Sequence, residues 1–175
     1  MMTRKALPEG KYRDHLVYAD GRVVDYGWRC NVIVDQCRQL LAAFMQGQAA
    51  SGIQRISLGR GDTSWDSLPY EAPVPSTSSL MDSSPHDIAV ADAEMSISFL
   101  DISGNTTSDV HSRIEVSVTI EGDSLPIGSG ETFPLREFAL YGELNSNDYM
   151  IDYVRHGVIH IGQGDVLTRR VRLVF

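Results

Sequence analysis

The sequence predicts a mainly β protein: an antiparallel β-sandwich with one α-helix at about residues 31–47 and an extended N-terminal arm. Three observations favour this fold class. Apolar and polar residues alternate along several segments, which is the period of a half-buried strand. Short polar turns separate these segments. Apolar residues recur at helical spacing in only one segment. We therefore expect two packed sheets with a single helix on them or at their end.

The composition suits one globular domain and excludes two classes of partner. The chain has 175 residues, of which 42% are hydrophobic, enough for a sizeable core. Its net charge of -8 disfavours non-specific binding to nucleic acid, which depends on clustered Lys and Arg. No apolar run has the length of a membrane span or of an export leader. We expect neither nucleic acid nor a membrane as a partner, and synthesis in the cytosol.

Residues 1–28 are predicted to form an arm and residues 29–175 the sandwich domain. The first segment is polar and contains turn signals, so it is read as an extended arm or a loose hairpin around Asp20-Gly21. Its aromatic residues, including Tyr12, Tyr18 and Trp28, favour ordering, because disordered tails contain few aromatics. We interpret it as an arm that docks on a neighbouring subunit. Deleting it is expected to leave a folded monomer that cannot assemble.

The helix follows the arm. Asn31 is a suitable N-cap and Gly47 a suitable end. Apolar residues recur at steps of three and four along one face, which is more typical of core than of a partner groove. These residues are Ile33, Cys37, Leu40, Leu41, Phe44 and Met45.

A strand at residues 53–59 leads into a segment rich in Pro and Ser, which predicts a long surface loop at about residues 62–86. Together with the arm, this loop is a candidate contact element. The rest of the chain is expected to be β, with the clearest alternation at residues 113–120. Further strands are expected at residues 95–99, 133–141, 149–154, 157–161 and 166–175.

The densest apolar run outside the helix is Phe133-Pro-Leu-Arg-Glu-Phe-Ala-Leu-Tyr-Gly142. Its apolar residues change phase between Leu135 and Phe138. This change requires a β-bulge between them, or a different buried face on each half. A bulge would re-aim Glu137. A carboxylate in such a run needs an Arg or backbone N–H partner.

No motif in the chain assembles into a catalytic or metal-binding pattern. The Arg60-Gly-Asp62 tripeptide is interpreted as a turn after a strand. His156 and His160 have a helical zinc spacing, but the β-branched residues between them favour a strand. We expect no enzymatic activity, no cofactor and no metal.

Several segments resemble those of phage tail-type structural proteins, which include tail-fibre attachment, baseplate and collar adaptors and their relatives in contractile injection systems. The most specific is Leu135-Arg-Glu-Phe-Ala-Leu-Tyr-Gly142, although such proteins normally have Gly where Ala139 stands. The others are the helix from Asn31, Ile56-Ser-Leu-Gly59-Arg-Gly61, the loop leucine Leu80 (here followed by Met-Asp instead of Glu), Ser96–Phe99, Tyr153–His156 and Leu167–Phe175.

The resemblance implies an adaptor or connector in a virion tail or tail-like particle, with copies of itself and other tail proteins as partners. Two alternatives remain open: a β-sandwich that binds a glycan or receptor near Trp65, Tyr70 and Glu71, and a small hydrolase. The candidate interaction residues are Tyr12, Tyr18, Trp28, Trp65, Tyr70, Arg136 and Glu137.

Overall fold

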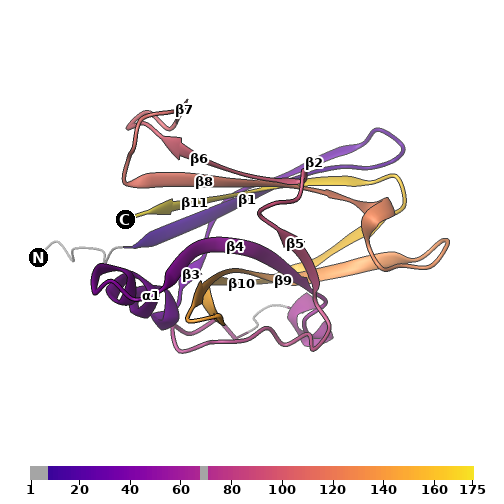
Figure 1. Cartoon of the computed structure of the whole chain (residues 1–175). Helices are drawn as coiled ribbons and strands as arrows, with labels where there is room; N and C mark the ends of the chain where they lie inside the picture. Colours follow the sequence, from indigo (N-terminus) through magenta and orange to yellow (C-terminus); the bar gives the residue numbers. More distant parts are fainter. Residues whose placement is uncertain (1–7, 68–70) are drawn as a thin grey trace, which may run out of the picture.

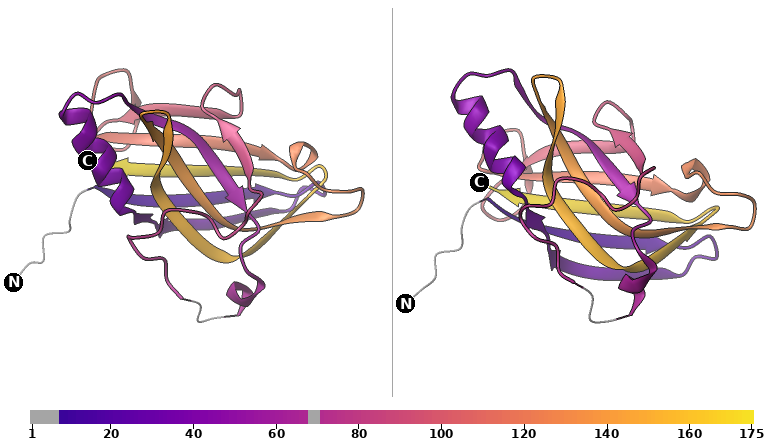
Figure 2. Two further views of the ribbon diagram at one scale, coloured as in Figure 1. Left: turned by 60° about the horizontal axis from the view of Figure 1, so that its bottom comes forward. Right: turned by 90° about the horizontal axis from the view of Figure 1, so that it is seen from below.

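Two antiparallel β-sheets pack face to face in the computed structural model, which describes residues 8–67 and 71–175 (Figure 1). The sheets form the two layers of a sandwich, and one helix lies at the end where the chain finishes (Figure 2). The predicted fold class, a mainly β antiparallel sandwich with one α-helix, is confirmed.

One layer is a six-stranded sheet built around the C-terminal strand. Its strands, in spatial order, are β2 (Val23–Cys30), β1 (Glu9–Val17), β11 (Val166–Val174), β8 (Arg113–Glu121), β6 (Met95–Leu100) and β7 (Thr106–Thr107).

The other layer is a five-stranded sheet with the long strands β9 and β10 near its centre. Its strands, in spatial order, are β3 (Val32–Ile33), β10 (Asn147–Gly162), β9 (Thr132–Leu144), β4 (Ala50–Gly59) and β5 (His86–Ala89). The helical elements are α1 (Asp35–Met45) and two 3-10 turns, η1 (Thr63–Asp66) and η2 (Gly122–Ser124).

The core lies between the sheets and follows the alternation in the sequence. On β8, Val116, Val118 and Ile120 are fully buried, while the residues between them are partly exposed. Burial of each such side chain contributes roughly 1.5–3 kcal/mol of favourable transfer free energy. Opposite them, Phe138 of the five-stranded sheet meets Tyr12 edge-on, with ring centroids 5.3 Å apart. The strands predicted from alternation therefore supply much of the core.

The helix is shorter than predicted and begins without the predicted cap. It runs from Asp35 to Met45, and its N-cap Val34 makes no side-chain capping hydrogen bond. Asn31 instead donates from Nδ2 to Oδ2 of the buried Asp152, at 2.6 Å. The β-branched residues after Asn31 form the short strand β3 on the edge of β10, which delays the helix. Gly47 has a φ of 84° and ends the helix as predicted.

The prediction of an extended N-terminal arm is wrong for the described part of residues 1–28, whereas its alternative, a hairpin around Asp20-Gly21, is confirmed. That segment forms the β1–β2 hairpin, and β1 pairs with β11 along its whole length. Tyr12 and Leu16 are core residues. Alternation predicted no strand here because the inward residue between them is the charged Asp14, which is also buried. Removing residues 1–28 would therefore take two strands from the sheet and part of the core. Residues 1–7 lie outside the described part.

The predicted break in the densest apolar run is confirmed. The pairing of β9 with β10 shifts from Glu137–Arg155 to Leu135–Ile159, so Arg136 stands opposite a longer stretch of β10. Leu135 and Phe138 both belong to the inter-sheet core, although they are separated by an odd number of residues. The bulge thus directs both intervening side chains away from the core.

A buried ion pair crosses the β1–β11 ladder inside the sandwich. Arg169 and Asp14 are 0% and 1% exposed. Nε and Nη2 of Arg169 each donate to one carboxylate oxygen of Asp14, both at 2.7 Å. The guanidinium also lies over the ring of Phe138, 4.0 Å from its centroid. Because both charges have left water, each depends on the other for its stabilisation.

We predict that Asp14→Asn will lower the free energy of unfolding by about 3–5 kcal/mol, because it leaves the Arg169 charge buried without a counter-charge. The measurement is urea denaturation followed by circular dichroism. Asp25→Asn is the matched control, since Asp25 pairs with Arg13 on the exposed surface of the same hairpin and its loss should change stability little. Equal effects of the two substitutions would contradict the assignment of a buried pair.

Candidate interaction surfaces

The side chain of Glu137 fastens the Pro- and Ser-rich loop to the outer face of the five-stranded sheet. Glu137 is fully buried. Its carboxylate accepts the backbone N–H groups of Met81, at 3.0 Å, and Asp82, at 2.7 Å. It also accepts the hydroxyl of Tyr153, at 2.6 Å. Burial, followed by this hydrogen bond to Glu137, raises the pKa of Tyr153 above its ordinary value. The predicted need for a backbone N–H partner is confirmed.

Arg136 fastens the beginning of the same loop. Its Nε and Nη2 donate to the two carboxylate oxygens of Asp66, at 2.9 and 2.8 Å, a bidentate pair. Its Nη1 donates to the carbonyl of Arg60, at 3.0 Å. The hydrogen bond from Arg136 lowers the pKa of Asp66. Asp66 also accepts the N–H of Val158 from the irregular part of β10. Arg136 and Glu137 therefore do not pair with each other; each holds a different part of the loop.

A second, smaller apolar cluster fills the space under this loop. Ala139, Tyr141, Met150 and Tyr153 point outward from β9 and β10 and pack together with Val34, and the loop residue Leu80 covers them. The loop is also held by Asp35, whose N–H donates to the carbonyl of Pro75 at 2.8 Å. It runs across the outer side of the five-stranded sheet (Figure 2). We call residues 71–85 the strap. Its outer side exposes Val74 and Met81.

The structure brings only part of the predicted interaction residues to the surface. Tyr12, Trp65, Arg136 and Glu137 are buried, so the prediction that they contact a partner is corrected: they hold the chain together. Tyr18 is half-buried at the hairpin turn, with Arg22 over its ring, 4.4 Å from the centroid. Trp28 is half-buried on the outer face of the six-stranded sheet. Tyr70 lies outside the described residues.

The inter-sheet polar cluster contains a neutral histidine. Nδ1 of His156 is 2.7 Å from the carbonyl of Gly157, and Nε2 is 3.1 Å from Nη2 of Arg169. The carbonyl requires a proton on Nδ1, and the guanidinium requires a lone pair on Nε2. Burial, followed by the charge of Arg169, lowers the pKa of His156 to about 4. His156 and the exposed His160 thus lie in different environments.

Asp152 is the second titratable group of this region and shifts in the opposite direction. Burial raises its pKa to about 7, although the N–H of Leu140 and the amide of Asn31 both donate to it. The Asn31 amide also fills the space beside Gly10, where a Cβ atom would lie 2.0 Å from Oδ1 of Asn31. Glycine at position 10 is therefore needed for the Asn31–Asp152 contact.

An apolar groove opens at the end of the sandwich, beside α1. It has a volume of about 180 Å³ and is lined by Cys37, Leu40, Leu41, Ile53, Ile97 and Phe175, among others. Leu41 is 38% exposed, and Phe44 and Met45 are 64% and 82% exposed. Because residues three and four apart share one side of a helix, Phe44 and Met45 extend the apolar surface by one turn beyond Leu41. The sequence predicted this helical face as core; the structure buries only part of it.

Two features escaped the sequence. The Asp14–Arg169 pair joins positions 155 residues apart, and no local pattern marks it. The groove combines residues of α1 with residues of both sheets, which no local pattern can bring together. The only sequence signal for it is the number of apolar residues on the helix. Among the described residues, no group of His, Cys, Asp or Glu is arranged to hold a metal ion, and no described helix is long and apolar enough to cross a membrane.

Comparisons with protein-family models, with curated protein sequences and with solved structures found no match to this chain.

We predict that Glu137→Gln will release the strap, because an amide cannot accept from both loop N–H groups and the Tyr153 hydroxyl as the carboxylate does. We expect a loss of about 2 kcal/mol in unfolding free energy and faster hydrogen exchange at Met81 and Asp82. Mass spectrometry of exchanged peptides measures the second effect. Glu143→Gln, further along the same strand and only half-buried, is the control. Unchanged exchange in the strap would contradict its attachment by Glu137.

We predict that acidification lowers the free energy of unfolding, because the buried His156 stays neutral in the folded protein. Its pKa is about 4 in the folded protein and 6.5 as the ordinary value, so between these pH values the unfolded chain binds the proton and the folded chain does not. Stability from this group is complete above about pH 6.5 and falls as the pH drops towards 4.

His156→Gln isolates this contribution, because Asp152 titrates with the opposite sign in part of the same range. The advantage in unfolding free energy of the natural protein over the variant should shrink by about 3 kcal/mol between pH 6.5 and 4. Urea denaturation at several pH values measures it. A difference that does not depend on pH would refute the neutral, buried assignment.

Proposed function

We propose that this protein is a structural component of a phage tail or tail-like particle, in which it acts as an adaptor between neighbouring subunits at a fibre attachment, collar or baseplate. Its partners are other copies of itself and other tail proteins, and its place is the virion. The observation that carries the proposal is the apolar groove beside α1, with Phe44 and Met45 exposed next to it. The resemblance of the segment Leu135–Gly142 and of the closing strand to tail-type proteins supports the kind of assembly.

The groove supports a docking role because its apolar surface is continuous. Monomeric proteins rarely leave large contiguous apolar patches in water, whereas scattered single residues are common. Leu41, Phe44 and Met45 come from two successive turns of one helix, next to a concave apolar floor. A side chain of a neighbouring subunit inserted into this floor would remove both surfaces from water, at roughly 25 cal/mol per Å² of buried apolar area.

The strap supports the same role. It fixes residues 71–85 to the outer sheet face by Glu137, while Val74 and Met81 remain exposed on it. A preorganised loop loses little conformational entropy when it binds. A rigid sandwich that presents such elements to neighbours suits a part that acts by shape. In this proposal the strap keeps the contact role that the sequence assigned to the loop at about residues 62–86, whereas the N-terminal hairpin is part of the sheet.

The alternative of a glycan- or receptor-binding module loses the ring of Trp65, one of its three predicted residues. Trp65 was expected to offer a stacking surface, but it is 5% exposed. The guanidinium of Arg155 lies 4.8 Å from the centroid of its ring. The ring therefore serves the internal packing of the strap and η1, and a sugar has no access to most of it.

We predict that Leu41→Ser combined with Phe44→Ser and Met45→Ser will abolish self-association. Size-exclusion chromatography with light scattering should show oligomers of the natural protein and monomers of the variant at the same concentration, and electron microscopy should show closed rings only for the natural protein. Ile102→Ser with Val110→Ser is the control. These residues are 82% and 84% exposed but lie outside the groove, so the control should assemble normally.

A natural protein that stays monomeric at high concentration and joins no tail particle would overturn the proposal. So would assembly that survives the triple substitution, since the groove would then not be the contact. The folding of each variant is checked by circular dichroism, because Leu41 is partly buried and its replacement could also destabilise the packing of the helix.

A further inference from the structure

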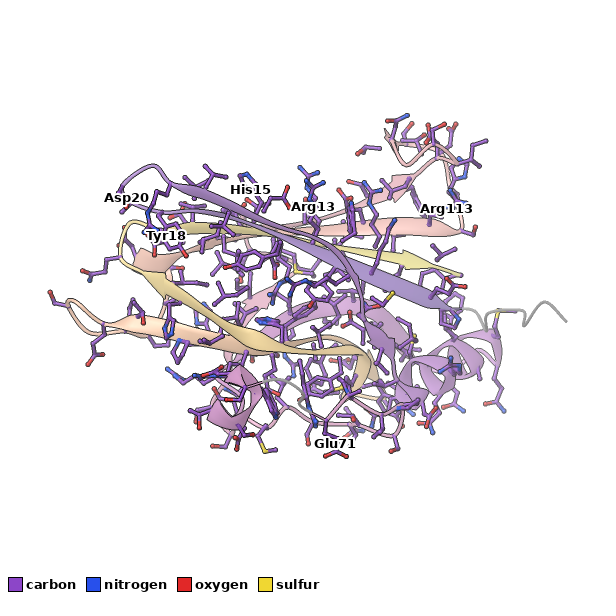
Figure 3. All side chains as sticks on the ribbon, turned by 180° about the vertical axis from the view of Figure 1, so that it is seen from behind. Arg13, His15, Tyr18, Asp20, Glu71 and Arg113 are labelled. Atoms are coloured by element: carbon purple, nitrogen blue, oxygen red, sulfur yellow. The ribbon has the colours of Figure 1, made fainter. Side chains whose placement is uncertain are left out.

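The outer face of the six-stranded sheet carries a double row of cations. Side chains alternate along β1, so Lys11, Arg13 and His15 point away from the core that contains Tyr12 and Leu16. Figure 3 shows Arg13 and His15 on this outer side. On β11 the same alternation directs Arg170 and Arg172 outward between buried residues. Arg113 begins β8 next to them.

The register places these cations directly against one another. Lys11 pairs with Arg172, and Arg13 pairs with Arg170, at neighbouring outward positions of the same ladder. Like charges opposite each other on a sheet are destabilising, by roughly 0.2–1 kcal/mol per pair. Two such pairs in succession occur in a chain whose net charge is -8. A surface that keeps an unfavourable arrangement of this kind is a candidate for binding.

Only part of this charge is neutralised within the chain. Arg13 pairs with Asp25, and Arg172 donates from Nε to Glu115 at 2.6 Å. Among the described residues, Lys11 and Arg170 form no ion pair with a carboxylate. Arg113 donates to the carbonyl of Ile102, at 2.8 Å, and forms no ion pair in the described part of the chain either. Three cations on one face are therefore available to an anion.

The face is hollowed along the ladder. One cavity, of about 410 Å³, is lined by the cations Lys11, Arg113 and Arg172 and by one acidic residue, Glu9. A second, of about 240 Å³, is lined by Arg13, His15, Thr168 and Arg170. Because the two sets are neighbours in the β1–β11 register, the cavities follow one another along the strands. We call the two together the cationic groove. It lies on the opposite face of the sheet from the core.

Trp28 holds two of the cations in place. The Nζ of Lys11 and the guanidinium of Arg172 lie 4.9 and 4.6 Å from the centroid of its ring. These contacts fix the charges at the floor of the groove. They also occupy the one Trp of this face, so it offers no free platform for stacking a sugar or a base. The groove is therefore organised to recognise charge.

We infer that the cationic groove binds an extended acidic segment of another polypeptide. Successive outward residues of β1 are about 6.8 Å apart, as are alternate side chains of any extended chain. A segment with an acidic residue at every second position can therefore place one carboxylate at each successive cation pair. Each contact would be a charge-assisted hydrogen bond. Apart from Leu173, which borders both, this surface and the apolar groove are formed by different residues, and the test of peptide binding is independent of self-association.

The probe is a fluorescein-labelled dodecapeptide of alternating Glu and Thr, with binding followed by fluorescence anisotropy at low ionic strength. The natural protein should bind it, and should bind a peptide with the same residues in two blocks more weakly, because only the alternating one matches the spacing. Replacing both Lys11 and Arg170 by Gln should weaken binding about tenfold or more, which corresponds to 1.4 kcal/mol or more.

The matched control removes the same charge elsewhere: Arg22→Gln with Arg38→Gln, both exposed and outside the groove. This variant should bind like the natural protein. Arg170→Gln alone should not lower the melting temperature, because it relieves a like-charge pair. No binding of the alternating peptide, equal loss in the two double variants, or tighter binding of heparin or oligothymidylate through Lys11 and Arg170 would overturn the inference.

Discussion

The register break between β9 and β10 is the constraint on which most of the structure depends. Side chains alternate between the two faces of a strand. Two consecutive residues can therefore both point away from the core only where an irregularity interrupts the alternation. The break supplies this change at Arg136 and Glu137 and keeps Leu135 and Phe138 in the core. Glu137 then reaches the strap, and Arg136 reaches Asp66 of η1. His156 of β10 follows the inward Val154 by two residues, so it shares its face and meets Arg169 in the core.

This arrangement explains why a carboxylate can be fully buried in the most apolar segment of the chain. Glu137 receives two backbone N–H groups and one hydroxyl, so its charge is stabilised by dipoles that the strap supplies. The backbone N–H groups of Met81 and Asp82, which lie in a loop without regular backbone pairing, find their acceptor in this carboxylate. The Pro- and Ser-rich composition correctly predicted a loop, but it could not show that the loop is attached to the sheet.

Local patterns predicted most strands and the turn at Asp20-Gly21, but not that the first hairpin belongs to the core, for a physical reason. On β8, apolar residues face the core and polar residues face water, so the period is visible. On β1, the inward position between Tyr12 and Leu16 is Asp14, whose partner Arg169 lies on the last strand. When the partner of a charged residue lies so far along the chain, a pattern of neighbouring residues predicts that the charged residue is exposed. Asn31 is a second case of a distant partner: it was predicted to cap the helix, but its amide donates a hydrogen bond to Asp152 instead.

The strand β11 ties the interior to the proposed contact surfaces. Its inward residue Arg169 completes the buried ion pair, and its outward neighbours Arg170 and Arg172 line the cationic groove. Phe175, which follows it, borders the apolar groove. An apolar surface can pair with the same surface of another copy, whereas a cationic surface repels its own kind. A contact made through the cationic groove is therefore heterologous, with an acidic surface of the neighbour facing it. Contacts of this type close into rings or extend into filaments, according to whether the rotation between successive subunits closes.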